Sequence, residues 1–289
     1  MPAKTDKTVI TSFTEKGYDR YGKRFIETFR ENWPESVRLV VYYEGTHLRE
    51  DWLPIGKVPN LDAWMRIIAP FPMMAGNLFG QYDIRYDAST NRVIFMQNYA
   101  LRNYKGKVFW LDGDVITHAK VPETFLDEML PDDKLCCYLG RGDWYDSETG
   151  FIGFNYGHPN CEEFLRIEEN TLFSGIIFAQ PRWWDMVTFD WARVCYLAKE
   201  PKLESAFIDL AKDLPRGTMH PFINAAPGAY MDHLKGDRKG DRSPVSDLVI
   251  TRTEPYWTSP IYKDGDGSQP IPAPTSVGAA VAQAVGAGG

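Results

Sequence analysis

Hydrophobic and polar positions alternate along the chain in a way that predicts strands and helices in succession. Short runs of apolar and β-branched residues with polar flanks predict strands at 9–13, 37–43, 107–111, 135–139 and 150–155. Apolar residues at helical spacing predict helices at 18–33, 92–102, 161–172, 181–195 and 204–212. Because strand and helix follow each other in this manner, we expect an α/β fold with a mostly parallel central sheet.

Two segments depart from this pattern. Residues 46–80 are rich in Pro, Trp and Met and predict an irregular stretch. From residue 264 onward the chain is rich in Gly, Ala, Pro and Ser and has no aromatic residue, which predicts a flexible tail over 264–289. The remainder, 1–263, is expected to form one domain.

Charge and composition narrow the range of functions. The chain of 289 residues carries a formal charge of −7, so its overall field does not attract it to a phosphate backbone. It contains no apolar stretch long enough to span a membrane and no apolar secretory leader, so we expect a cytoplasmic protein. Its four cysteines lack the spacing of a zinc site or a disulfide framework.

The sharpest chemical signal is VFWLDGDVI at 108–116, where an apolar strand runs directly into Asp112, Gly113 and Asp114. In open α/β sheets, ligands bind at the carboxyl ends of the strands. Two carboxylates so close together are costly to bury unless a cation or a hydrogen-bond donor compensates them. The motif therefore predicts a site for a divalent metal or a nucleotide, and the alternative is an Asp-Gly surface turn.

A DxD motif placed after an apolar strand, well downstream of an N-terminal strand ending in Thr-Ser-Phe, resembles the GT-A fold of nucleotide-sugar-dependent glycosyltransferases, including phage and bacterial members. The resemblance covers most of 9–242. It implies a Rossmann-type three-layer sandwich, Mn²⁺ or Mg²⁺ as cofactor, and a nucleoside-diphosphate sugar as donor, most often a uridine diphosphate hexose. The acceptor would be a hydroxyl, on a glycan or on a hydroxymethylated pyrimidine in DNA.

The resemblance also implies roles for particular residues. The metal ligands would be Asp112, Asp114 and His233, since carboxylates and an imidazole together suit Mn²⁺. His233 opens a segment rich in Lys, Arg and Gly that would wrap a diphosphate, and the alternative is a solvated loop. The donor-binding residues would be Thr11, Ser12, Phe13, Glu44, Arg92, Asp112, Gly113, Lys235, Gly236 and Arg238.

A second candidate region, 140–155, carries acids beside aromatic residues. One acid there could accept the proton of an acceptor hydroxyl, with Glu148 preferred over Asp146 and Asp143. Trp144 and Tyr145 could stack on the acceptor. If the enzyme retains anomeric configuration, no such base is needed. The alternative is a polar turn without a catalytic role.

Two rival functions remain at this level. A phosphatase of the haloacid dehalogenase type would use Asp112 as nucleophile and Asp114 as acid, although that motif usually opens its domain. The second rival is a non-catalytic binding protein, which would keep the fold but no longer turn over a substrate. Trapping of a phospho-aspartate at Asp112 distinguishes the phosphatase from the glycosyltransferase.

Overall fold

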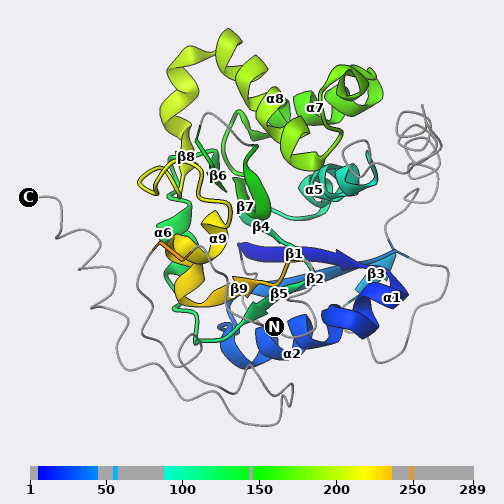
Figure 1. The fold of residues 1–289 in the computed structure, drawn as a ribbon, viewed down its shortest axis with the longest axis vertical. Helices are drawn as coiled ribbons and strands as arrows, with labels where there is room; N and C mark the ends of the chain where they lie inside the picture. The colour runs from blue at the N-terminus through cyan, green and yellow to red at the C-terminus, as the bar shows by residue number, and fades with distance from the viewer. Residues whose placement is uncertain (1–5, 45–54, 58–87, 143–145, 236–247, 250–289) are drawn as a thin grey trace, which may run out of the picture.

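The computed structural model describes residues 6–44, 55–57, 88–142, 146–235 and 248–249, and two sheets lie within them. The larger is a seven-stranded sheet with strand order β3-β2-β1-β4-β7-β6-β8, and the smaller pairs β5 with β9 (Figure 1). The strands are β1 Lys7–Phe13, β2 Arg38–Tyr43, β3 Ile55–Lys57, β4 Lys107–Leu111, β5 Val115–Thr117, β6 Cys136–Leu139, β7 Glu148–Asn155, β8 Phe207–Asp209 and β9 Met231–His233.

Most neighbours in the large sheet are parallel. β1 pairs in parallel with β2 and β4, β2 with β3, and β6 with β8. β7 is the exception, because it runs antiparallel to both β4 and β6. The expectation of a mostly parallel central sheet is confirmed.

Helices cover both faces of this sheet. The α-helices are α1 Glu15–Gly17, α2 Lys23–Asn32, α5 Arg92–Asn103, α6 Phe125–Met129, α7 Cys161–Phe173, α8 Asp185–Lys199 and α9 Pro221–Asn224. Figure 1 shows α5, α7 and α8 on one side of the sheet and α1 and α2 on the other. A π-helical turn at Tyr18–Gly22 joins α1 to α2, and short 3-10 turns occupy Ala88–Asn91, Ile176–Ala179, Pro201–Ala206 and Ala226–Ala229. Within the part of the chain that the structure describes, no helix combines the length and apolar character needed to cross a membrane.

The strands fill two cores because successive side chains point to opposite faces. Val9 and Phe109 belong to the core shared with α2 and α6. Ile10 and Trp110 belong to the core shared with α5, α7 and α8. Strands buried on both faces are continuous apolar runs, which is why the sequence pattern found them. The three-layer α/β sandwich is confirmed.

One predicted element is wrong and one is shifted. The helix expected at 204–212 is absent, since residues 207–209 instead form β8, whose register pairs Cys136 with Phe207. Pairing with an available sheet edge outweighs the weak helical spacing there. The helix expected from 181 begins only at Asp185, because Trp184 keeps an extended backbone. Most of 46–80 and the whole of 264–289 lie outside the described residues.

Candidate functional site

The carboxyl edge of the sheet gathers the polar residues that the sequence singled out. β1, β2 and β4 run in parallel, so Phe13, Glu44 and Asp112 follow one another at the same edge. The antiparallel β7 begins at that edge with Glu148. The backbone N–H of Asp112 donates to the carbonyl of Gly150 at 3.1 Å, which places the start of β7 beside the DxD turn.

The small sheet brings His233 to the same place. Val115 of β5 lies opposite His233 of β9 in an antiparallel pair. The backbone N–H of Leu234 donates to the carbonyl of Asp114 at 3.2 Å and closes the pairing. Because β5 starts directly after the DxD turn, this pairing sets the imidazole against both aspartates.

Asp112, Asp114 and His233 form a compact cluster in which one ligand atom from each residue lies within 4.8 Å of the others. The Nε2 atom of His233 lies 3.0 Å from Oδ1 of Asp114 and 3.4 Å from Oδ2 of Asp112. Asp114 and His233 are buried, whereas the Asp112 side chain is 32% exposed. Asp112 is therefore half-buried and is the most accessible of the three side chains.

Gly113 is required by close packing. A Cβ atom at this position would lie 2.6 Å from Cδ1 of Phe13 and 2.9 Å from the carbonyl oxygen of Ser12. The DxD turn therefore sits directly on the end of β1, and a side chain at Gly113 would force the turn and the strand apart.

The charges in the cluster compensate one another. Removal from water raises the pKa of Asp112, and the nearby Asp114 raises it further, although His233 opposes both effects. Burial alone would lower the pKa of His233, but Asp114 and Glu148 outweigh it and raise that pKa to about 10. The raised pKa of His233 therefore reflects the acids that face its two ring nitrogens.

This donor set fits a divalent cation. Two carboxylates and one imidazole nitrogen converge from the end of β4 and from β9, and mixed O/N ligation suits Mn²⁺ or Mg²⁺ more than a soft metal. The grouping is the one expected from the sequence. Among the residues that the structure describes, Asp112, Asp114 and His233 are the three His, Cys, Asp or Glu side chains whose ligand atoms lie close enough to share one metal ion.

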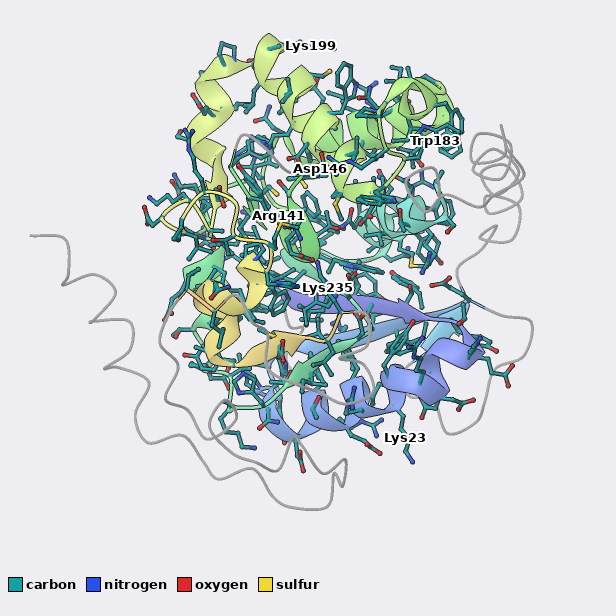
Figure 2. The ribbon with its side chains drawn as sticks, viewed as in Figure 1. Lys23, Arg141, Asp146, Trp183, Lys199 and Lys235 are labelled. Atoms are coloured by element: carbon teal, nitrogen blue, oxygen red, sulfur yellow. The ribbon has the colours of Figure 1, made fainter. Side chains whose placement is uncertain are left out.

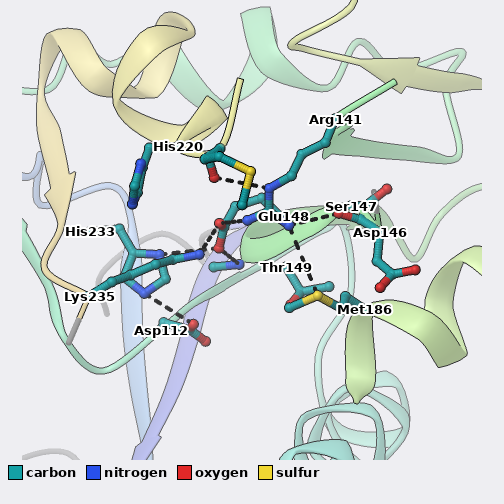
Figure 3. A network of polar contacts seen from close by, with 12 residues as sticks. Asp112, Arg141, Asp146, Ser147, Glu148, Thr149, Met186, His220, His233 and Lys235 are labelled. Atoms are coloured by element: carbon teal, nitrogen blue, oxygen red, sulfur yellow. Dashed lines mark hydrogen bonds and ion pairs between the residues drawn. The ribbon is translucent and has the colours of Figure 1, made fainter. Parts of the chain in front are cut away.

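Glu148 stands behind the imidazole, where it meets three cationic groups (Figure 3). Its Oε1 atom lies 3.2 Å from Nδ1 of His233, and its Oε2 atom accepts from Nη2 of Arg141 and from Nζ of Lys235. Burial alone would raise the pKa of Glu148, but Lys235, His233 and Arg141 hold it well below its usual range. A carboxylate so strongly stabilised is a weak proton acceptor.

The other predicted acids differ in setting. Asp146 is ion-paired with Arg182 at 2.8 Å, and burial raises its pKa. Figure 3 shows the Asp146 carboxylate directed away from Asp112 and His233. Asp143, Trp144 and Tyr145 lie outside the described residues, as do Gly236 and Arg238.

A second polar group lies at the ends of β1 and β2. Ser12 Oγ donates to Oε1 of Glu44 at 2.6 Å, and Nε of Arg92 donates to the same carboxylate at 2.9 Å. Arg92 also donates to the carbonyl of Ser89 at 2.9 Å, so its guanidinium is held firmly. The structure therefore brings together the sequence-predicted Ser12, Glu44 and Arg92.

The side chains of Thr11 and Phe13 are fully buried in β1. Phe13 packs edge-on against Tyr18, Tyr21 and Phe25, which makes it part of the core. Thr11 and Phe13 are thus buried beneath the edge of the sheet, whereas Ser12 contacts Glu44 there.

Asp185 is a site residue that sequence reasoning missed. It begins α8, is buried, and accepts from Thr149 Oγ1 at 2.7 Å. Burial and the nearby Asp112 raise its pKa to about 6. An acid in the first turn of a helix is ordinary in sequence, so nothing marked it as a neighbour of the DxD turn.

Figure 2 places Arg141 and Lys235 in the middle of the molecule, whereas Lys23 and Lys199 lie at opposite ends of the view. The side chains of Arg141 and Lys235 are 7% and 33% exposed, respectively. Both side chains therefore lie at the carboxyl edge of the sheet, where they contact Glu148.

No family model matches the sequence, and no curated protein matches it. Three solved structures similar to the chain are all glycosyltransferases. One acts in glycosylation of the major capsid of PBCV-1, with 14% identity, a TM-score of 0.46, and coverage of 80% of this chain and 96% of that chain. The second is GlyE of Streptococcus pneumoniae, with 13% identity, a TM-score of 0.42, and coverage of 71% and 45%. The third is mouse xyloside xylosyltransferase 1, with 11% identity, a TM-score of 0.41, and coverage of 71% and 84%. At such low identity, residue roles follow from the geometry of the site alone.

Proposed function

We propose that this protein is a metal-dependent glycosyltransferase that moves a sugar from a nucleoside-diphosphate sugar to a hydroxyl acceptor. The observation that carries the proposal is the convergence of Asp112, Asp114 and His233 at the carboxyl edge of the sheet. The same edge bears a cation, Lys235, and a separate polar group formed by Ser12, Glu44 and Arg92. A nucleoside-diphosphate sugar needs a metal and a cation for its diphosphate, and polar contacts for its nucleoside. The three groups at this edge offer these contacts.

Different residues would bind different parts of the donor. Asp112, Asp114 and His233 would hold Mn²⁺ or Mg²⁺. When bound, the cation would supply Lewis-acid stabilisation of the negative charge that develops on the departing diphosphate. Lys235, held by Glu148, would direct a further N–H donor to the same oxygens. Gly236 and Arg238 are proposed to contact the diphosphate as well.

The nucleoside end of the donor would lie over the ends of β1 and β2. Ser12 and Glu44 offer oxygen atoms that accept hydrogen bonds from a ribose hydroxyl or a base N–H. Arg92 holds the Glu44 carboxylate in place through a contact of 2.9 Å from Nε. We take a uridine diphosphate hexose as the first donor to test.

The acceptor side would be formed by the segment around 143–146 and by Asp185. If the reaction inverts, Asp185 is a candidate proton acceptor, since it starts α8 beside Thr149 of β7. The anomeric configuration of the product, read by NMR, decides whether any base is required. Competition binding with glycans and with hydroxymethylated DNA would identify the class of acceptor.

The deciding experiment is donor turnover. Purified protein with Mn²⁺ should release nucleoside diphosphate from a nucleotide sugar, slowly with water and faster with the correct acceptor. Asp114→Ala should abolish this release. Phosphate release from phosphomonoesters, with a trapped phospho-aspartate at Asp112, would instead establish the phosphatase alternative.

A further inference from the structure

We infer that Glu148 is a positioning residue, which orients His233 toward the metal and anchors Lys235 beside it. The inference rests on the proposed metal site. It gives Glu148 a different role from proton transfer with the acceptor, and the contacts of its two carboxylate oxygens support that role.

The first oxygen, Oε1, faces the imidazole. It lies 3.2 Å from Nδ1 of His233, and it accepts from the backbone N–H of Gly150 at 3.2 Å. Because the two ring nitrogens of a histidine are distinct, a carboxylate next to Nδ1 favours a proton on that atom. Nε2, which lies close to Asp114 and Asp112, is then the nitrogen left to bind a cation.

The ring has little freedom to turn away from this orientation. Gly150 approaches it so closely that an added Cβ would lie 2.5 Å from Nδ1. Phe222 packs against the imidazole edge-on, with ring centroids 5.7 Å apart. Glu148 supplies the polar contact, and these two neighbours supply the steric limits.

The second oxygen, Oε2, ties together two cations from separate segments. Lys235 follows β9, and Arg141 follows β6. Arg141 also donates to the carbonyl oxygens of Asp146 at 2.7 Å and Met219 at 3.1 Å. One buried carboxylate therefore joins the segment after β9 to the segment after β6.

Loss of this carboxylate would leave Lys235 and Arg141 close together without the acid that balances them, and would remove the polar contact at Nδ1 of His233. Lys235 and the imidazole would then lose the group that holds them in place. In metalloproteins, carboxylates that orient a histidine ligand typically contribute about 10–100-fold to metal affinity. The same range is expected for Glu148.

The test is Mn²⁺ titration of the full chain by calorimetry, comparing wild type with Glu148→Gln and Glu148→Asp. We expect Glu148→Gln to weaken Mn²⁺ binding by about 10–100-fold. Glu148→Asp keeps the charge and should recover part of the lost Mn²⁺ affinity. If Glu148→Gln does not fold, Glu148→Asp still tests the inference. In the Mg²⁺-loaded wild type, ¹⁵N NMR should show the proton of His233 on Nδ1.

The matched control is Asp209→Asn. Asp209 holds the same segment after β6, but it does so by accepting from the backbone N–H of Gly140 at 2.8 Å. It also accepts from the backbone N–H of Ala211 at 2.9 Å. This variant should bind Mn²⁺ like wild type.

Two results would overturn the inference, and they differ in their cause. If Glu148→Gln binds Mn²⁺ within twofold of wild type and keeps the same His233 tautomer, Glu148 has no positioning role, although the metal site stands. If wild type itself binds no Mn²⁺, the proposed function fails and the inference falls with it.

Discussion

Nε2 of His233 lies 3.0 Å from Oδ1 of Asp114 because β5, which begins directly after Asp114, pairs with β9, which ends at His233. Val115 opposes His233 in the small sheet, so the DxD turn and the imidazole meet through backbone pairing and need no long flexible loop. A site built on paired strands holds its ligands more closely than one built on loops. This pairing makes the cluster a definite target for substitution.

Asp114→Asn should remove metal binding while leaving the fold intact. The variant keeps the shape of the side chain but loses the charge that a divalent cation requires. We expect Mn²⁺ affinity to fall by at least about 100-fold, more than the loss of a supporting contact would cause. Calorimetric titration measures this, and nucleoside diphosphate release should fall with it. Asp133→Asn is the control, since Asp133 is 72% exposed and pairs only with Lys134 among described residues. Unchanged Mn²⁺ affinity in Asp114→Asn would rule out the metal site.

Gly150→Ala should disrupt the site through sterics alone. The new Cβ would lie 2.5 Å from Nδ1 and 2.6 Å from Cε1 of His233, so the ring must move. We expect Mn²⁺ binding to weaken by more than about tenfold, with far-UV circular dichroism unchanged. Gly157→Ala, where the nearest atom is Oδ1 of Asn155 at 3.2 Å, is the control and should bind normally. Equal affinities in the two variants would show that the position of the His233 ring does not matter for binding.

Glu44→Gln should separate nucleotide binding from metal binding. Glu44 accepts from Ser12 and Arg92 and belongs to a group distinct from the three metal ligands. Loss of its charge should weaken nucleoside diphosphate binding by about tenfold, or roughly 1.4 kcal/mol, while Mn²⁺ affinity stays unchanged. Glu27→Gln on α2, where Glu27 is 60% exposed, is the control. A loss of Mn²⁺ affinity in Glu44→Gln would contradict the division into two groups.

Sequence patterns predicted the sheet and the DxD edge well, because strands buried on both faces are continuous apolar runs. They found Asp112 and Asp114 by their place at the end of such a run. They could not show that Glu148 meets Arg141 and Lys235, since that depends on the antiparallel direction of β7. Asp185 and the edge strand β8 were missed for a similar reason, because contacts between residues far apart in the sequence decide both.

Glu168 provides a test of stability apart from the site. It is buried on α7, and among the described residues its Oε2 atom has no hydrogen-bond partner. Burial, followed by the nearby Asp185, raises the pKa of Glu168 well above its usual range. Below the unfolded-state pKa of about 4.3, both folded and unfolded protein keep the proton, and the group has no effect. Above it, the unfolded state releases the proton while the folded state retains it, so the free energy of unfolding falls as pH rises.

Glu168→Gln removes this penalty because the amide stays neutral. We expect the variant to unfold with a free energy higher than wild type by about 1–3 kcal/mol at pH 8, and with little difference at pH 4. Urea denaturation at both pH values measures the effect. Glu163→Gln, on the exposed side of the same helix, should match wild type at both. A gain that is equal at pH 4 and pH 8 would show that packing, and not the buried charge, sets the stability at this position.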